Sequence, residues 1–359
     1  MREVIKRLLT GLALILLSGM ITYSCLAQKE TVAGERSAGT GVVGTIMTVL
    51  GPIPASGFGR ALTHEHIEGS FVNLDEVGEI QYSRDDAVDA MLPLLQDLRD
   101  RDFTGIVECS TVDLGRDVEV LYRLSELTGL HILTNTGNYS SADDSILLSY
   151  AVIESADQLA ARWVKEWVEG IDETGIKPGF IKIGVDPGPL DEIDRKMVQT
   201  AAKTHLQTGL TIACHSPDSK AALDVLDTVR EEGVHPSALI VIHSDDYPDQ
   251  TVHFQLAEAD AWVEFDHVAS PWVELLIEDH VRLIEAMLEK GYGDRLLLSH
   301  DAAWYDVSQP DGGDLRIPYT PIADQLIPAL KNAGVSEKQL RQLLVENPAR
   351  AFTVKVRKL

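Results

Sequence analysis

The sequence predicts an α/β chain that folds as one (β/α)₈ TIM barrel, and three features support this prediction. Eight apolar runs rich in β-branched residues alternate with amphipathic stretches of helical period. Five of these runs end at a histidine, lysine or aspartate, as expected at the carboxyl ends of strands in a parallel barrel. The chain has 359 residues, enough for a barrel of about 250 residues with additions.

The expected elements alternate as βα repeats, which imply a parallel sheet with helices outside it. The expected strands are 60–66, 105–110, 131–136, 179–185, 210–215, 239–244, 261–268 and 296–301. The expected helices are 85–100, 118–127, 156–174, 191–208, 219–232, 251–259, 272–290, 322–333 and 337–346. Residues 42–58 contain Gly51-Pro52-Ile53-Pro54 and are expected to form a turn-rich lead-in to the first strand.

The N-terminal segment is expected to be an export signal, which we favour over a buried first helix. Arg2, Lys6 and Arg7 precede an apolar segment, residues 8–21, that is too short for a comfortable membrane span. Residues rich in Gly, Ser and Thr follow, as in a tether. The expected organisation is a signal peptide at 1–25, a flexible linker at 26–41 and a single barrel domain at 42–359.

Two cleavage sites compete at the end of this signal. Thr22-Tyr23-Ser24-Cys25 is a loose lipobox, and cleavage there would leave Cys25 as a lipidated N-terminus. Cys25-Leu26-Ala27 is an ordinary small-x-small site, which would make Gln28 the first mature residue. We favour the lipid anchor at Cys25, so the protein is expected to be exported, to a membrane surface, the periplasm or the medium.

Composition limits the partners of the chain. The formal net charge of −25 argues against nucleic acid and anionic membranes, both of which bind basic surfaces. Of the three cysteines, Cys109 and Cys214 end expected strands. We interpret them as packed thiols, with a disulfide between them as the alternative.

Polar residues at the ends of the expected strands form the most informative pattern. His64 and His66 are two residues apart, so strand alternation directs both to one face. The carboxyl ends of the strands of a parallel barrel also meet at one face. The candidate metal ligands are therefore His64, His66, Lys182, His215, His243 and Asp301.

This set of side chains suits a metal-dependent hydrolase with two ions. Two divalent ions about 3.5–4 Å apart can hold a bridging hydroxide that is nucleophilic at neutral pH. The first two histidines with Asp301 would hold one ion, and His215 with His243 the other. Lys182 cannot bind a cation as an ammonium, so it would be neutral or react with CO₂ to form a carbamate, N6-carboxylysine, that bridges both ions.

Six segments resemble the phosphotriesterase family of the amidohydrolase superfamily, and the resemblance covers residues 43–359. They are Leu62-Thr63-His64-Glu65-His66, GFIKIG at 179–184, IHSDD at 242–246, FDH at 265–267, LSHD at 298–301 and Asn347-Pro348-Ala349-Arg350. The resemblance implies a (β/α)₈ barrel, a carbamylated Lys182 and two divalent ions. Zn²⁺ is the expected metal, with Co²⁺, Mn²⁺ and Fe²⁺ as alternatives. It also implies a homodimer.

The same resemblance implies a proton relay that runs from Asp301 through His267 to Asp246. Imidazole suits such a step because it titrates near neutral pH. Asp266 is the alternative polar partner. Alternation along the strands directs Glu65 and His300 away from the cavity, so both are expected to support or pack rather than bind.

The substrate is indicated by Tyr139, which follows the third expected strand. In the family, lactone-hydrolysing members tend to have tyrosine at this position, and the strongest organophosphate hydrolases have tryptophan. The alternative is that Tyr139 only lines the rim. Trp272, Trp304 and Tyr305 are expected to wall an apolar or sugar-binding pocket.

The sequence thus predicts an exported binuclear metal-dependent hydrolase of a small lactone or carboxyl ester. Two alternatives are open: a phosphotriester or phosphoester hydrolase with the same centre, and a non-catalytic surface lipoprotein that binds metal.

Overall fold

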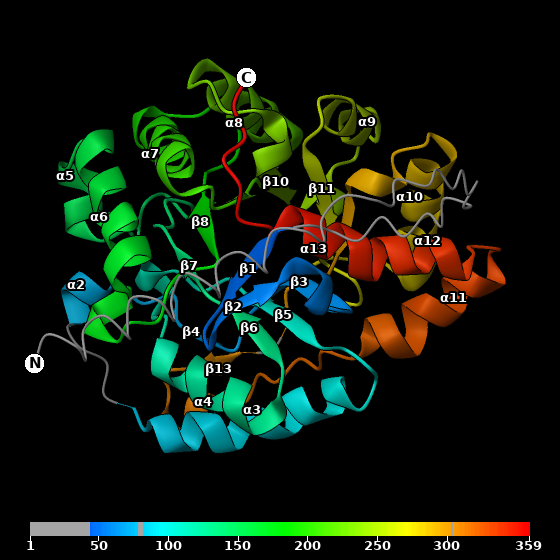
Figure 1. The fold of residues 1–359 in the computed structure, drawn as a ribbon, viewed down its shortest axis with the longest axis horizontal. Helices are drawn as coiled ribbons and strands as arrows, with labels where there is room; N and C mark the ends of the chain where they lie inside the picture. Colours follow the sequence, from blue (N-terminus) through cyan, green and yellow to red (C-terminus); the bar gives the residue numbers. More distant parts are fainter. Residues whose placement is uncertain (1–43, 78–81, 303) are drawn as a thin grey trace, which may run out of the picture. The chain divides into compact units, whose positions relative to one another are not determined.

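Parallel strands lie at the centre of the described residues and helices lie outside them (Figure 1). The computed structural model describes residues 44–77, 82–302 and 304–359. The expected signal peptide, its Cys25 and the linker at 26–41 lie outside the described residues. In the described ranges, no helix has both the length and the apolar character that a membrane crossing needs.

The barrel is built from two parallel sheets that join end to end. Its strands are β3 (Ala61–Glu65), β5 (Gly105–Glu108), β6 (His131–Leu133), β7 (Asn135–Thr136), β8 (Phe180–Gly184), β9 (Ile212–His215), β10 (Leu239–Ile242), β11 (Trp262–Phe265) and β12 (Leu296–Leu298). One sheet has the order β3-β5-β6 and the other β7-β8-β9-β10-β11-β12. Only Thr134 separates β6 from β7, so the sheets share the strand expected at 131–136.

Backbone hydrogen bonds join the other two ends of the sheets, just beyond β12 and β3. The amide of Asp301 donates to the carbonyl of His64 at 3.2 Å, and the amide of His66 donates to the carbonyl of Ala302 at 3.0 Å. The sheet is therefore a closed (β/α)₈ barrel, as the sequence predicted. This closure also places the end of β12 directly beside the first two candidate ligands.

The helices cover the outside of the barrel (Figure 1). They are α2 (Leu74–Val77), α3 (Arg84–Arg99), α4 (Val118–Thr128), α5 (Ser149–Ile153), α6 (Ala156–Glu169), α7 (Glu192–Thr208), α8 (Ser219–Glu231), α9 (Thr251–Glu258), α10 (Ile277–Glu289), α11 (Ile327–Asn332), α12 (Glu337–Arg341) and α13 (Asn347–Ala351). The expected C-terminal helices contain π-helical turns at Ile322–Leu326 and Gln342–Glu346.

Two expected helices are shorter than predicted, for local reasons. The helix expected at 156–174 ends at Glu169, because Gly170 adopts a φ of 102° that breaks the helical path. The helix expected at 272–290 begins only at Ile277, where Asp279 accepts a 2.8 Å hydrogen bond from the amide of Leu276. The residues before Leu276 are thereby left in a loop near the carboxyl ends of the strands.

The lead-in at 42–58 contains structure that the sequence did not predict. β1 (Thr45–Thr48) and β2 (Gly51–Pro54) form an antiparallel hairpin. Ile46 of this hairpin packs with Phe58, Phe352 and inward-facing strand residues such as Leu133 in one buried cluster. The hairpin therefore helps to fill the amino-terminal end of the barrel, so that the opposite end is free for the site. A second short pairing, of β4 (Glu68–Gly69) with β13 (Tyr305–Asp306), was also missed.

Alternation along the strands divides the core into an inner and an outer part. Val107 and Ile240 face the inner cluster, whereas Ile106 and Val241 pack under the helices. Within the described ranges, Cys109 and Cys214 are both buried free thiols and form no disulfide with each other, in agreement with packed thiols.

Candidate metal centre

The six candidate ligands, the relay residues and Tyr139 all line one cavity of about 260 Å³. They come from the carboxyl ends of the strands or the loops that follow. The residues are His64, His66, Tyr139, Lys182, His215, His243, Asp246, His267 and Asp301. Strand periodicity was therefore sufficient to bring the six candidate ligands together, whereas Tyr139, Asp246 and His267 followed from the family resemblance.

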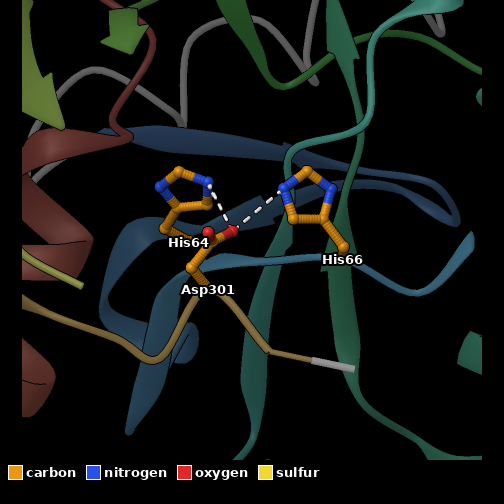
Figure 2. A group of neighbouring side chains, drawn as sticks. All are labelled: His64, His66 and Asp301. Atoms are coloured by element: carbon orange, nitrogen blue, oxygen red, sulfur yellow. Dashed lines mark ion pairs between the residues drawn. The ribbon is translucent and has the colours of Figure 1, made fainter. Parts of the chain in front are cut away.

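The first candidate ion site has its three ligand atoms close together. Oδ1 of Asp301 lies 3.4 Å from Nε2 of His64 and 3.2 Å from Nε2 of His66. Figure 2 shows the Asp301 carboxylate between the two imidazole rings, which face it from either side. The ligand atoms of these three side chains all lie within 4.8 Å of one another. The arrangement suits a single divalent cation.

The hydrogen bonds of these imidazoles leave the correct nitrogen free for a metal. Nδ1 of His64 donates to Asp266 at 2.6 Å, because a carboxylate can only accept. Nδ1 of His66 donates to the hydroxyl of Ser110 at 2.9 Å, since that hydroxyl gives its own hydrogen to the carbonyl of Glu68. Nε2 of His64 is buried and has no hydrogen-bond partner among the described residues. A neutral imidazole with Nδ1 fixed in this way presents Nε2 as a ligand.

The second candidate ion site is formed around His243 and His215. Their ring centroids are 4.6 Å apart, and the rings are nearly perpendicular. Nδ1 of His243 donates to Asp266 at 3.0 Å, which again leaves Nε2 for a cation. Asp266 thus accepts from one ligand of each ion site and fixes the orientation of both rings.

Lys182 lines the same cavity as both sets of ligands, with only 1 % of its surface exposed. Burial and the charge of Lys182 lower the pKa of His64 to about 3. Burial and the charges of His243 and Lys182 lower the pKa of His215 well below its usual value. Lys182 is therefore near a ligand of each ion, as a bridging group has to be. Both histidines are neutral at neutral pH, which is the form that binds a cation.

Asp301 has an unusual backbone and a strongly perturbed side chain. Its φ of 51° lies in the left-handed region, which few residues other than glycine adopt. Burial would raise the pKa of its carboxyl, but hydrogen bonds with His267 and His66 hold it well below the usual range. The side chain is thus an anion that can bind a cation or accept a proton.

The candidate relay residues lie in line beyond Asp301. Nε2 of His267 is 3.5 Å from Oδ2 of Asp301, and Nδ1 of His267 donates to Asp246 at 2.9 Å. Burial would lower the pKa of His267, but its bonds with Asp246 and Asp301 raise it to about 12. Asp266, the alternative partner, is instead bound to the ligand histidines. The contacts therefore favour Asp246.

Sequence reasoning missed Asp245 and Ser110 and gave Asp266 a different role, although both aspartates lie inside motifs that it quoted. Asp245 accepts a 2.8 Å hydrogen bond from the amide of His267 and a 3.1 Å bond from Nε2 of His280. Asp266 and Ser110 orient ligand rings, as described above. Asp245 and Asp266 each stand next to a relay residue, and this adjacency was the available signal. Ser110 had no comparable signal.

Tyr139 is held against the candidate bridging lysine. Its ring centroid lies 5.9 Å from Nζ of Lys182 and 5.2 Å from the ring of His215. A Cβ on Gly184 would come within 2.6 Å of the tyrosine ring, so only glycine allows this approach. The amide of Tyr139 donates to the buried carboxylate of Asp113 at 2.7 Å. The tyrosine ring is therefore held among the residues that line the cavity.

The mouth of the cavity is aromatic. Trp304 lies 4.6 Å from the ring of His66 and stacks on Phe71 at 5.3 Å, both measured between ring centroids. Nε1 of Trp272 donates to the carbonyl of Asp301 at 3.1 Å. The sequence also predicted that Tyr305 lines the pocket wall, and this was wrong. Tyr305 belongs to β13 and does not line this cavity. Its pairing with β4 turns it away.

This fold and site define a metal-dependent hydrolase on a (β/α)₈ barrel. The model of the phosphotriesterase family matches residues 44–352, and the chain belongs to that family. A phosphotriesterase homology protein of Mycobacterium tuberculosis is 30% identical over 323 residues, covering 85% of this chain and 96% of that protein. Human N-acetyltaurine hydrolase is 27% identical over 351 residues, covering 87% of this chain and 99% of that protein.

Solved structures agree with this assignment. An organophosphorus hydrolase from Deinococcus radiodurans superposes with a TM-score of 0.79 at 25% identity, covering 87% of this chain and 99% of that chain. A mutant of a PTE-like lactonase from the same organism superposes with a TM-score of 0.78 at 25% identity, covering 86% of this chain and all of that chain.

Proposed function

We propose that this protein is a binuclear metal-dependent hydrolase of lactones or carboxyl esters. The observation that carries the proposal is that Tyr139 lines, beside Lys182, a cavity that also holds two sets of candidate ligands and several aromatic side chains. Two divalent ions would supply a nucleophilic oxygen from water at neutral pH and would polarise the carbonyl group. His64, His66 and Asp301 would hold one ion, and the other candidate ligands its neighbour.

The side chains of the protein would handle the proton and the carbonyl oxygen. Asp301 would accept the proton of the attacking water and pass it to the leaving alkoxide or to His267. His267 would hand it to Asp246, whose side chain is 27% exposed and so can exchange with solvent. The hydroxyl of Tyr139 would donate to the oxygen of the carbonyl as negative charge develops on it.

The cavity walls favour an uncharged substrate with an apolar substituent. Phe71, Trp272 and Trp304 line its mouth, and Leu114 and Pro217 line its sides. A sulfonated amide such as N-acetyltaurine, named for one group of relatives, carries an anionic sulfonate that a cationic side chain would bind most strongly. Among the described residues that line the cavity, Lys182 is the one lysine or arginine, and we assign it to the ions. This argues for lactones over such amides.

A substrate panel tests the proposal. Protein reconstituted with Zn²⁺ should hydrolyse lactones and carboxyl esters with a higher kcat/KM than it hydrolyses a phosphotriester or N-acetyltaurine. Phosphotriester hydrolysis, the alternative function, would use the same ion sites. All substrates are therefore compared on one metal-loaded preparation. Turnover of the triester with no turnover of any lactone or ester would refute the substrate assignment and leave the ion sites standing.

Tyr139→Phe refines the same test. Loss of a well-aimed donor to a developing oxyanion costs roughly 10²–10³-fold in kcat elsewhere. We expect a smaller loss of roughly tenfold on lactones, since an ion would already stabilise most of that charge. Tyr305→Phe removes a hydroxyl from outside the cavity and is the matched control. An unchanged kcat/KM in Tyr139→Phe would reduce the residue to a wall of the pocket.

A further inference from the structure

Glu65 stands between the ligands His64 and His66 but points away from the cavity. Its side chain is fully buried and accepts hydrogen bonds from residues on both sides of Asp301. Oε1 accepts from the hydroxyl of Ser299 at 2.6 Å and from the amide of His300 at 3.1 Å. These contacts join the ends of β3 and β12, where the barrel closes.

Two more bonds complete the set around Glu65. The ring of His300 donates from Nδ1 to Oε1 at 2.8 Å, because its Nε2 accepts from the amide of Ile322 at 2.9 Å. The amide of Ala302 donates to Oε2 at 2.9 Å. Four donors therefore converge on this one side chain, and both oxygens have to be acceptors. A carboxylate meets this demand, whereas an amide cannot.

The bonded segment, residues 299–302, surrounds the strained backbone of Asp301. A φ of 51° at a non-glycine residue persists only when neighbouring contacts hold it. The amides of His300 and Ala302 flank Asp301 directly, and both are held by Glu65. The hydroxyl of Ser299 also accepts from the amide of His64 at 2.9 Å. The turn and the first ligand histidine are thus held by one network.

We propose that Glu65 is a positioning residue that holds the turn at Asp301, so that the Asp301 carboxylate faces Nε2 of His64 and of His66. The proposal rests on the two ion sites of the proposed function. The middle residue of the His-Glu-His motif would thus position the ligands of one ion, the ion at His64, His66 and Asp301. Among the described residues, His215 and His243, the candidate ligands of the second ion, form no hydrogen bond with Glu65 or with residues 299–302; His243 is bonded to Asp266 instead. Loss of Glu65 should therefore weaken the binding of one ion and leave the binding of the other unchanged.

Metal affinity in Glu65→Gln tests this selectivity. We expect the dissociation constant of one ion to increase 10- to 100-fold and that of the other to stay unchanged. Competition with a chromogenic chelator measures both constants. Anomalous scattering from crystals with partial metal occupancy should place the loss at His64 and His66. We expect kcat to fall more than KM changes, since Asp301 also accepts the proton.

Asp194→Asn is the matched control. Asp194 is another buried carboxylate at the carboxyl end of the barrel, and it accepts from the hydroxyl of Ser140 at 2.8 Å and from the amide of Asp186 at 3.1 Å. It has no bond to the turn at Asp301, so both dissociation constants should match those of the wild type. If Glu65→Gln does not fold, Ser299→Ala removes one donor to Glu65 and should give a smaller loss at the same ion.

Two outcomes would overturn the proposal. Unchanged affinity for both ions would mean that Glu65 does not position Asp301. An equal loss of affinity for both ions would mean that Glu65 only stabilises the barrel. A wild-type protein that binds two ions but hydrolyses no ester would refute the proposed function alone, because the selective loss in Glu65→Gln could still be measured.

Discussion

Lys182→Ala is expected to abolish binding of at least one ion and to lower kcat by roughly 10³-fold or more, since bound ions contribute several kcal/mol to such reactions. The reason is the position of Lys182 beside a ligand of each ion. An ammonium there would repel both ions, so we propose that the side chain carries a carbamate in the loaded protein. Short carboxylic acids should restore part of the activity by occupying the space of the lost bridge.

Metal analysis, turnover and intact mass check this expectation together. Lys203→Ala is the control, because Lys203 forms a surface ion pair with Asp157 at 2.8 Å, away from the cavity. It should retain the metal and the activity of the wild type. Full metal content in Lys182→Ala, or an unmodified Lys182 in a metal-loaded structure, would rule out the bridging role.

Asp301→Asn should show the second-largest loss, about 10²–10⁴-fold in kcat, the range typical of general acid–base groups. The amide would keep the size of the side chain, but it could not accept the proton or form an ion pair with His267. His267→Asn should give a smaller loss, because Asp301 would still accept the proton and only its route to Asp246 would be broken. The first ion should also bind more weakly in Asp301→Asn.

Steady-state kinetics on metal-saturated protein measure this effect apart from metal loss. Asp306→Asn is a suitable control, since Asp306 follows in the same loop but bonds to Ser308 and Gln309 and does not line the cavity. A kcat in Asp301→Asn within a few fold of the wild type at saturating metal would exclude Asp301 as the proton acceptor.

Local sequence patterns were sufficient for the barrel and for the six candidate ligands, whereas the relay residues and Tyr139 followed only from the family resemblance. The eight strands are short buried runs, and a period of two assigns each side chain to the inner or outer face. The polar residue that ends a strand is therefore placed at one end of the barrel by topology alone. This is why Lys182 and Asp301, far apart in the sequence, could both be assigned to one cavity.

Contacts between distant segments could not be predicted in this way. The hairpin of β1 and β2 is specified by packing against the barrel floor, and its proline residues indicated only turns. Tyr305 was misplaced because its pairing with β4 depends on how two loops meet. Glu65 was expected only to support or pack, since nothing local indicates that four donors from the end of β12 converge on it.

Metal stoichiometry tests the central claim most directly. Protein purified with Zn²⁺ supplied and then desalted should contain close to two equivalents of metal per chain, because six candidate ligands line one cavity. The measurement is elemental analysis, with circular dichroism on the same sample to confirm the fold. Folded protein with a stoichiometry near zero would contradict the account.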